Sequence, residues 1–190
     1  MKSTLLQVKQ LMEGYGEQYP WLIFVALVFL PGFGFPASIL LLLAGMVWGP
    51  EVSSALLALA AVALNIIWTH AVANGPGRNL VIRLLGERWQ RWKNQPRTDL
   101  IKLAVILRLT PGVPLFIQNY VLGLLGVPLA HSLLTALPLT GLYVFGFVLT
   151  GGAVFEGQLG RAVTGVCLIV VAGLVVKLVH FRIAGGVSRS

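Results

Sequence analysis

The sequence predicts an all-α integral membrane protein, an inverted repeat with two opposed re-entrant hairpins broken by Pro and Gly, each followed by a transmembrane helix. Of its 190 residues, 57% are hydrophobic and only 11% are charged, whereas a soluble domain carries about 25% charged residues. Residues 51–73 and 129–150 are each apolar and long enough to cross a hydrocarbon core of about 30 Å. We therefore expect a single membrane domain over residues 1–190.

The basic residues indicate the orientation of the chain. The formal net charge is +8, and seven of the fourteen Lys and Arg fall between Arg78 and Lys102, beside apolar segments. Cytoplasmic loops carry such an excess, and the partners it favours are membrane lipids with anionic headgroups rather than nucleic acid. We expect a multi-pass membrane protein whose central loop and C-terminus are cytoplasmic. The sequence is also compatible with a homo-oligomer.

The N-terminal part contains two short helical patterns. Residues 3–18 place apolar side chains on one face, which is typical of an interfacial helix on the membrane surface; a frayed soluble terminus is the alternative. From Trp21 the run WLIFVALVFL meets PGFGFP after only ten residues, and ten helical residues cover about half of the hydrocarbon core. Either this helix begins earlier, near Gly14, or the chain crosses only part-way.

The stretch from Pro36 to Gly49 is too short to span the membrane comfortably, and we interpret it as part of a re-entrant hairpin. Pro50 can open the helix that follows. Glu51 then lies where a negative charge favours the helix dipole. We prefer this capping role for Glu51 to the alternative, a proton-carrying one.

Two polar residues interrupt the span over residues 51–73. Asn65 near its middle and His70 near one end are polar enough to face protein or water rather than lipid. His70 and Glu51 are the candidates for a proton site.

The pattern from Arg78 to Lys93 predicts a basic amphipathic helix at the cytoplasmic interface. Its apolar side is formed by Val81, Leu84, Leu85, Trp89 and Trp92. Further along, Pro138 and Gly141 predict a kink in the span that starts at Leu129. Residues 162–180 form the last predicted transmembrane helix.

The segment from Arg108 to Pro128, RLTPGVPLFIQNYVLGLLGVP, is the main candidate for the functional site. Pro111, Gly112 and Pro114 break the helix, because proline lacks an N–H donor and clashes with the preceding turn. Broken backbone at membrane depth persists only where protein buries it or where it lines a wet cavity. We therefore predict a helical hairpin that enters the membrane and turns back.

The two broken stretches match in spacing. Each has a proline, a glycine nine residues later and a second proline five residues after that: Pro36, Gly45 and Pro50, then Pro114, Gly123 and Pro128. With a cytoplasmic central loop, the spans that follow run in opposite directions, so the repeats are inverted. Inverted repeats with broken segments in corresponding positions indicate a transporter site near the bilayer midplane.

Arg108 is the only charged residue between Lys102 and Glu156. Arginine keeps its proton in proteins, so we expect an anionic ligand, and a phosphate headgroup would suit its planar donor fork. The alternatives are that Arg108 snorkels to the interface or pairs with Glu51. Gln118 and Asn119 either contact the ligand or satisfy the broken backbone.

No catalytic constellation is present in the sequence. The three histidines lie far apart, and there is no HExxH, GxSxG or phosphate-loop pattern. The single cysteine, Cys167, excludes a disulfide framework and a thiolate zinc site. We expect no enzyme activity, no cofactor and no metal site.

The motifs RLTPGVP and NYVLG, followed by a Pro-led helix, resemble the SNARE-associated, or VTT-domain, membrane proteins of the DedA superfamily. FPASILLLLAGMVWGP is similar to the first hairpin of that family, and NGPGR to its loop entry, so the resemblance covers about residues 30–150. It implies a helical fold with two opposed re-entrant hairpins. It also implies lipid transport or scrambling, in bacteria notably recycling of a polyprenyl-phosphate carrier, and other members are linked to proton-motive-force maintenance and drug resistance.

The family arginine before Pro-Gly corresponds to Arg108. In the DedA branch proper, an acid follows the first hairpin's proline by two residues, where this chain has Ser38, a candidate substrate contact. That branch also has another arginine where this chain has Pro114. Both departures make the chain more similar to the non-DedA branch of VTT-domain proteins.

Three functions are compatible with these residues. The first is a lipid transporter or scramblase for phosphate-bearing lipids, either a polyprenyl-phosphate carrier or a phospholipid, in which Arg108 binds the phosphate. The second is a proton- or ion-coupled small-solute antiporter that depends on Glu51 or His70. The third is a non-transporting membrane scaffold.

Overall fold

The computed structural model describes residues 19–87, 100–109 and 113–155, together with 163, 165–171, 173–174 and 177. All regular structure in these residues is helical, which confirms the all-α prediction. The elements are α2 (Trp21–Phe29), the 3-10 helix η1 (Leu30–Phe33), α3 (Ala37–Trp48), α4 (Val52–Asn74), α5 (Arg78–Leu85), α7 (Leu100–Leu109), α8 (Leu115–Leu124) and α9 (Leu129–Phe155).

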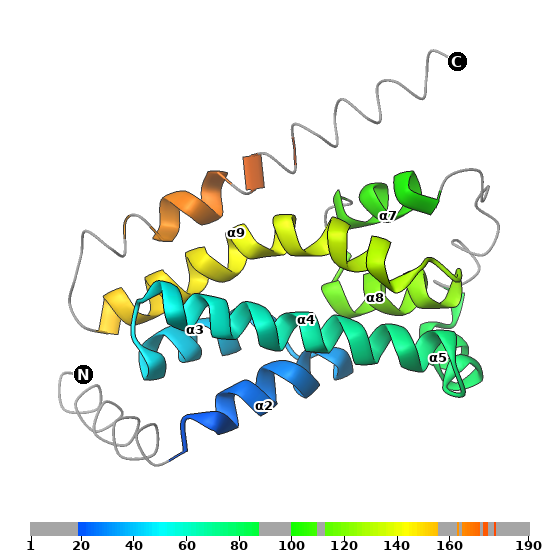
Figure 1. The fold of residues 1–190 in the computed structure, drawn as a ribbon, viewed down its shortest axis with the longest axis horizontal. Coiled ribbons are helices and arrows are strands. Elements are labelled where there is room, and N and C mark those ends of the chain that lie inside the picture. The colour runs from blue at the N-terminus through cyan, green and yellow to red at the C-terminus, as the bar shows by residue number, and fades with distance from the viewer. Residues whose placement is uncertain are drawn as a thin grey trace.

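Two long helices, α4 and α9, run side by side through the length of the molecule (Figure 1). Within the described residues, Val52–Asn74 and Leu129–Ala153 are long and apolar enough to cross a membrane. The 23 residues of α4 extend over about 34 Å. Both spans lie where the sequence predicts them, and α9 remains helical through Pro138.

The shorter helices form two chain reversals that open toward opposite ends of this pair (Figure 1). From one end, α2 and η1 run toward the middle, and the chain turns at Gly34, whose φ of 94° suits glycine, and returns as α3. From the other end, α7 runs toward the middle and α8 returns. Pro36 and Pro114 are the N-cap residues of α3 and α8. Residues 110–112, including Pro111 and Gly112, lie outside the described residues.

The helices of the two matched stretches pack in a reciprocal way. α3 is followed in the chain by α4 but packs on α9. α8 is followed by α9 but packs on α4. At these crossings Gly45 meets the Val148 carbonyl, and a Cβ on Gly123 would lie 2.7 Å from the His70 carbonyl. Gly45 and Gly123 are 78 residues apart, and so are His70 and Val148. Small residues at these points let the helices approach closely.

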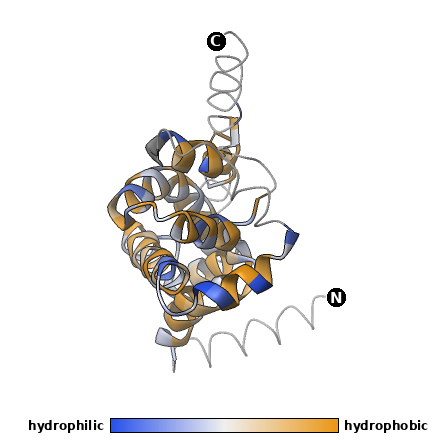
Figure 2. Cartoon of the chain, turned by 90° about the vertical axis from the view of Figure 1, so that its right-hand side faces the viewer, coloured by the Kyte–Doolittle hydropathy of each residue, from blue (hydrophilic) through white to orange (hydrophobic). Residues whose placement is uncertain are grey.

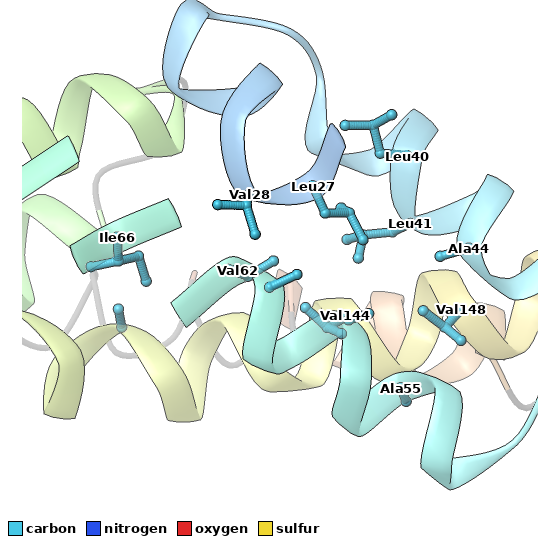
Figure 3. Packing of buried hydrophobic residues seen from close by; sticks show 13 residues of the cluster. Leu27, Val28, Leu40, Leu41, Ala44, Ala55, Val62, Ile66, Val144 and Val148 are labelled. Carbon is cyan, nitrogen blue, oxygen red and sulfur yellow. The ribbon is translucent and has the colours of Figure 1, made fainter. Parts of the chain in front are cut away.

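Two apolar clusters hold the helices together. The first lies between α2, α3, α4 and α9 and includes Leu27, Leu41, Val62 and Val144 (Figure 3). The second joins α8 to α5, α7 and the end of α4. Large apolar side chains such as Leu56, Leu64 and Leu134 are also exposed, and in the end-on ribbon view most helical residues are coloured as hydrophobic (Figure 2). Such an all-round apolar character is typical of helices in a membrane.

The helix predicted from Arg78 to Lys93 ends at Leu85, because Gly86 adopts a left-handed backbone with a φ of 51°. Val81 and Leu85 are buried as its predicted apolar side requires, but Leu84 is 75% exposed. Trp89 and Trp92 lie outside the described residues, as do the predicted helix over residues 3–18 and much of the predicted span over 162–180.

Candidate functional site

Arg108 lies in the last turn of α7 and is only 8% exposed. Its Nη1 donates a hydrogen bond to Gln118 Oε1 at 3.2 Å, and its Nη2 donates to Ser132 Oγ at 3.1 Å. One guanidinium thus joins α7 to α8 and α9. Its Nε, also buried, has no hydrogen-bond partner among the described residues. The described partners of this cation are therefore both neutral.

Glu51 does not pair with Arg108. It lies at the N-cap of α4, is exposed, and accepts a hydrogen bond from Ser53 Oγ at 3.1 Å. Arg108 in turn does not snorkel to the surface, because its side chain is buried. A pairing with Glu51, one of the alternatives for Arg108, is therefore excluded in this structure.

Gln118 accepts a hydrogen bond from Arg108 and also donates one to the backbone. Its Nε2 donates to Val113 O at 2.9 Å, just before the start of α8. Asn119 is fully buried, and neither its Oδ1 nor its Nδ2 has a partner among the described residues. A buried amide without partners is costly unless something else bonds to it.

Ser132 is the site residue that the sequence analysis missed. It is fully buried in the first turns of α9. The matched spacing contained a signal for it, because Ser54 follows Pro50 by four residues as Ser132 follows Pro128. Ser54 is also buried, but its Oγ donates to Trp48 O at 2.9 Å, at the turn between α3 and α4.

His70 belongs to the same buried region, on α4. It is 3% exposed, lies close to the Val127 backbone and to Arg108, and its Nδ1 has no partner among the described residues. Of the two predicted proton-site candidates, the structure thus brings His70 near Arg108 and leaves Glu51 at an exposed helix end. Ser38 lies half-buried on α3, in the other chain reversal.

The two chain reversals touch each other near the middle of the molecule. Tyr120 Oη on α8 donates to Gly32 O in η1 at 3.0 Å, and the Phe116 ring lies against Gly34. The Val28 carbonyl, near the end of α2, accepts two hydrogen bonds from side chains of α4. The donors are Asn65 Nδ2 at 2.7 Å and Trp68 Nε1 at 2.6 Å. Asn65 therefore faces protein, as its polarity predicts.

Arg108, Gln118 and Ser132 form a site with one positive charge, whose two neutral hydrogen-bond partners a ligand could replace. Oxygen atoms of Gln118 and Ser132 accept from Arg108, and an anion could replace either one at the guanidinium. Among the described residues, no cluster of His, Cys, Asp and Glu could hold a metal ion.

The long apolar helices and the apolar surface indicate a helical membrane protein. The VTT domain family matches residues 35–151, which is more than half of the chain. The chain belongs to this family, as the sequence motifs predict. The matched residues contain α3, α4, α8, the Arg108 site and most of α9. Searches of curated proteins and of solved structures returned no significant match.

Proposed function

We propose that the protein is a membrane lipid transporter or scramblase of the bacterial plasma membrane, and that Arg108 binds the phosphate of the lipid it moves. The carrying observation is that Arg108 is buried with only neutral partners among the described residues. Burying an ion without an opposite charge costs several kcal/mol. An anionic ligand that compensates this charge would offset that cost, and membrane phospholipids and polyprenyl-phosphate carriers both supply one.

The proposal includes two re-entrant hairpins that enter the bilayer from opposite sides. The 12 residues of α3 and the 10 of α8 extend over about 18 and 15 Å, roughly half of the hydrocarbon core. The reversals open toward opposite ends of the α4–α9 pair (Figure 1) and meet at the Tyr120–Gly32 hydrogen bond. With the central basic loop in the cytoplasm, the hairpin that contains Arg108 faces the cytoplasmic leaflet. Polar groups at half depth would lower the barrier to a crossing headgroup.

The test is headgroup translocation in proteoliposomes with fluorescent phospholipids. We expect the parent to exceed empty vesicles and Arg108→Ala to lose about 90% or more of that excess, since the charged hydrogen bonds it removes are among the stronger ones. Arg83→Ala is the matched control, because Arg83 is an exposed cation on α5. Equal translocation by the parent and Arg108→Ala would exclude the role of the arginine, and no translocation by the parent would refute the function.

A second candidate function is a proton- or ion-coupled small-solute antiporter. The observation that favours it is the burial of His70, an ionisable side chain, beside Arg108. It predicts that His70→Ala abolishes proton-coupled solute transport, whereas Glu51→Gln does not. Solute transport that is unchanged in both variants across a pH series would eliminate this function.

A further inference from the structure

The count of buried charges at the Arg108 site restricts its ligand. Among the described Lys and Arg residues, Arg108 is the one that is buried. Arg83, Lys102 and Lys177 are exposed. Arg78 is half-buried, and its Nη1 donates to the Leu124 carbonyl at the end of α8, at 2.8 Å. In the described part of the chain, Arg108 is therefore the one buried Lys or Arg side chain that a ligand could meet.

Among the described residues, Gln118 and Ser132 add hydrogen bonds to this cation but no charge. Gln118 and Ser132 are at most 7% exposed, and both are held by Arg108. The Ser132 hydroxyl accepts from Arg108, so its own proton is available to donate to an anion. The apolar residues Leu107, Ile117, Val121 and Leu122 of α7 and α8 are buried nearby in the second core cluster. A ligand charge that Arg108 does not match would therefore be buried among neutral and apolar groups.

We infer that the Arg108 site accepts a phosphate with a single negative charge, the phosphodiester of a phospholipid, and discriminates against a phosphomonoester, with Gln118 and Ser132 as the residues that set this limit. The inference rests on the proposed function and narrows it to phospholipids, because a polyprenyl phosphate is a phosphomonoester. A phosphomonoester carries about −1.5 to −2 charges at neutral pH, and the charge beyond the first would be buried without compensation. A phosphodiester carries one charge, which Arg108 balances.

The experiment compares two labelled lipids with the same acyl chains in proteoliposomes of phosphatidylcholine: phosphatidylglycerol, a phosphodiester, and phosphatidic acid, a phosphomonoester. It is run at about pH 8, where an ordinary histidine is neutral, so that the imidazole of His70 adds no second positive charge. We expect the parent to translocate phosphatidylglycerol roughly tenfold faster than phosphatidic acid, or more. The rates of empty vesicles are subtracted for each lipid.

Two variants of similar side-chain length test whether Gln118 sets the limit. Gln118→Lys adds a second cation beside Arg108 and is expected to reduce the preference for phosphatidylglycerol to about twofold or to invert it. Gln118→Met removes the amide without adding charge, so it is expected to change both rates by the same factor. Size-exclusion chromatography reports whether each variant folds.

Each outcome decides a separate point. A parent that translocates phosphatidic acid as fast as phosphatidylglycerol, or faster, overturns the charge limit and leaves lipid transport standing. A preference that is unchanged in folded Gln118→Lys overturns the role of Gln118. If the parent moves neither lipid, the proposed function fails and the limit fails with it. If Gln118→Lys does not fold, the ratio of the two rates in the parent still decides the charge limit.

Discussion

At the scale of single residues, Arg108 is held by groups from three helices rather than by its own segment. Gln118 lies ten residues away and Ser132 lies 24 residues away in the chain. Both fix the orientation of the guanidinium and leave its charge uncompensated. Their separation explains why the sequence indicated Arg108 and Gln118 but not Ser132.

Ser132→Ala is expected to lower lipid translocation about three- to tenfold, because the Nη2 donor of Arg108 loses its partner and a buried donor without one costs about 1–3 kcal/mol. The measurement is the initial translocation rate in proteoliposomes. Ser54→Ala is the matched control, since Ser54 occupies the corresponding place after Pro50 but bonds to Trp48 O. Equal rates in Ser132→Ala and Ser54→Ala would contradict the role of Ser132.

Asn119 allows a test that separates stability from function. Because neither polar atom of its side chain has a partner in the described structure, Asn119→Leu is expected to leave the free energy of unfolding unchanged or to raise it by about 1 kcal/mol. If Asn119 contacts the lipid, translocation falls at the same time. A loss of stability in thermal unfolding in detergent would instead show that the amide has a structural partner.

At the scale of elements, the helix crossings depend on glycine. A Cβ on Gly123 would lie 2.7 Å from the His70 carbonyl and 2.8 Å from the Ala73 Cβ. α8 can lie this close to α4 only because position 123 has no side chain. The nine-residue spacing from Pro114 places this glycine on the crossing, as it does Gly45 after Pro36.

Gly123→Ala is therefore expected to destabilise the protein by about 1–3 kcal/mol, since the helices must move apart. The control is Gly141→Ala in α9, where a Cβ would meet nothing within 4 Å. There, a gain of about 0.5–1 kcal/mol is expected from the better helix former. Thermal unfolding in detergent measures both, and a Gly123→Ala variant as stable as the parent would refute the close crossing.

The contact between the two chain reversals is expected to stabilise the fold. Tyr120→Phe removes the hydrogen bond to Gly32 O and is expected to cost about 1 kcal/mol of unfolding free energy. Tyr143→Phe, on α9, changes a hydroxyl with no hydrogen bond in the described structure and is expected to be neutral. If both variants unfold at the same temperature as the parent, the contact does not stabilise the fold.

At the scale of the whole molecule, the direction of α4 determines on which side of the membrane each of its ends lies. Glu51 precedes its first residue, and Glu87 follows α5 at its other end. If α4 spans the membrane and the central basic loop is cytoplasmic, the two glutamates lie on opposite sides. This orientation is part of the proposed function.

The prediction is tested with single cysteines at positions 51 and 87 in a Cys167→Ser background. A membrane-impermeant thiol reagent added to spheroplasts is expected to label position 51 at once, and position 87 only after permeabilisation. Labelling of both from the same side would exclude the proposed orientation. Translocation assays on the unlabelled variants show whether the substitutions themselves disturb the protein.

Sequence alone was enough to predict the helical membrane class, both long spans, the matched breaks and the isolated charge of Arg108. These features depend on local composition, on the length of apolar runs and on the backbone limits of proline and glycine. The end of α5 at Gly86 was missed because the amphipathic pattern continues past that residue. The packing of the helices was needed to show that Ser132 and His70 lie beside Arg108 and that Glu51 does not. The reason is physical: these neighbours follow from how α4, α7, α8 and α9 pack, and the packing depends on how closely distant small residues let the helices approach.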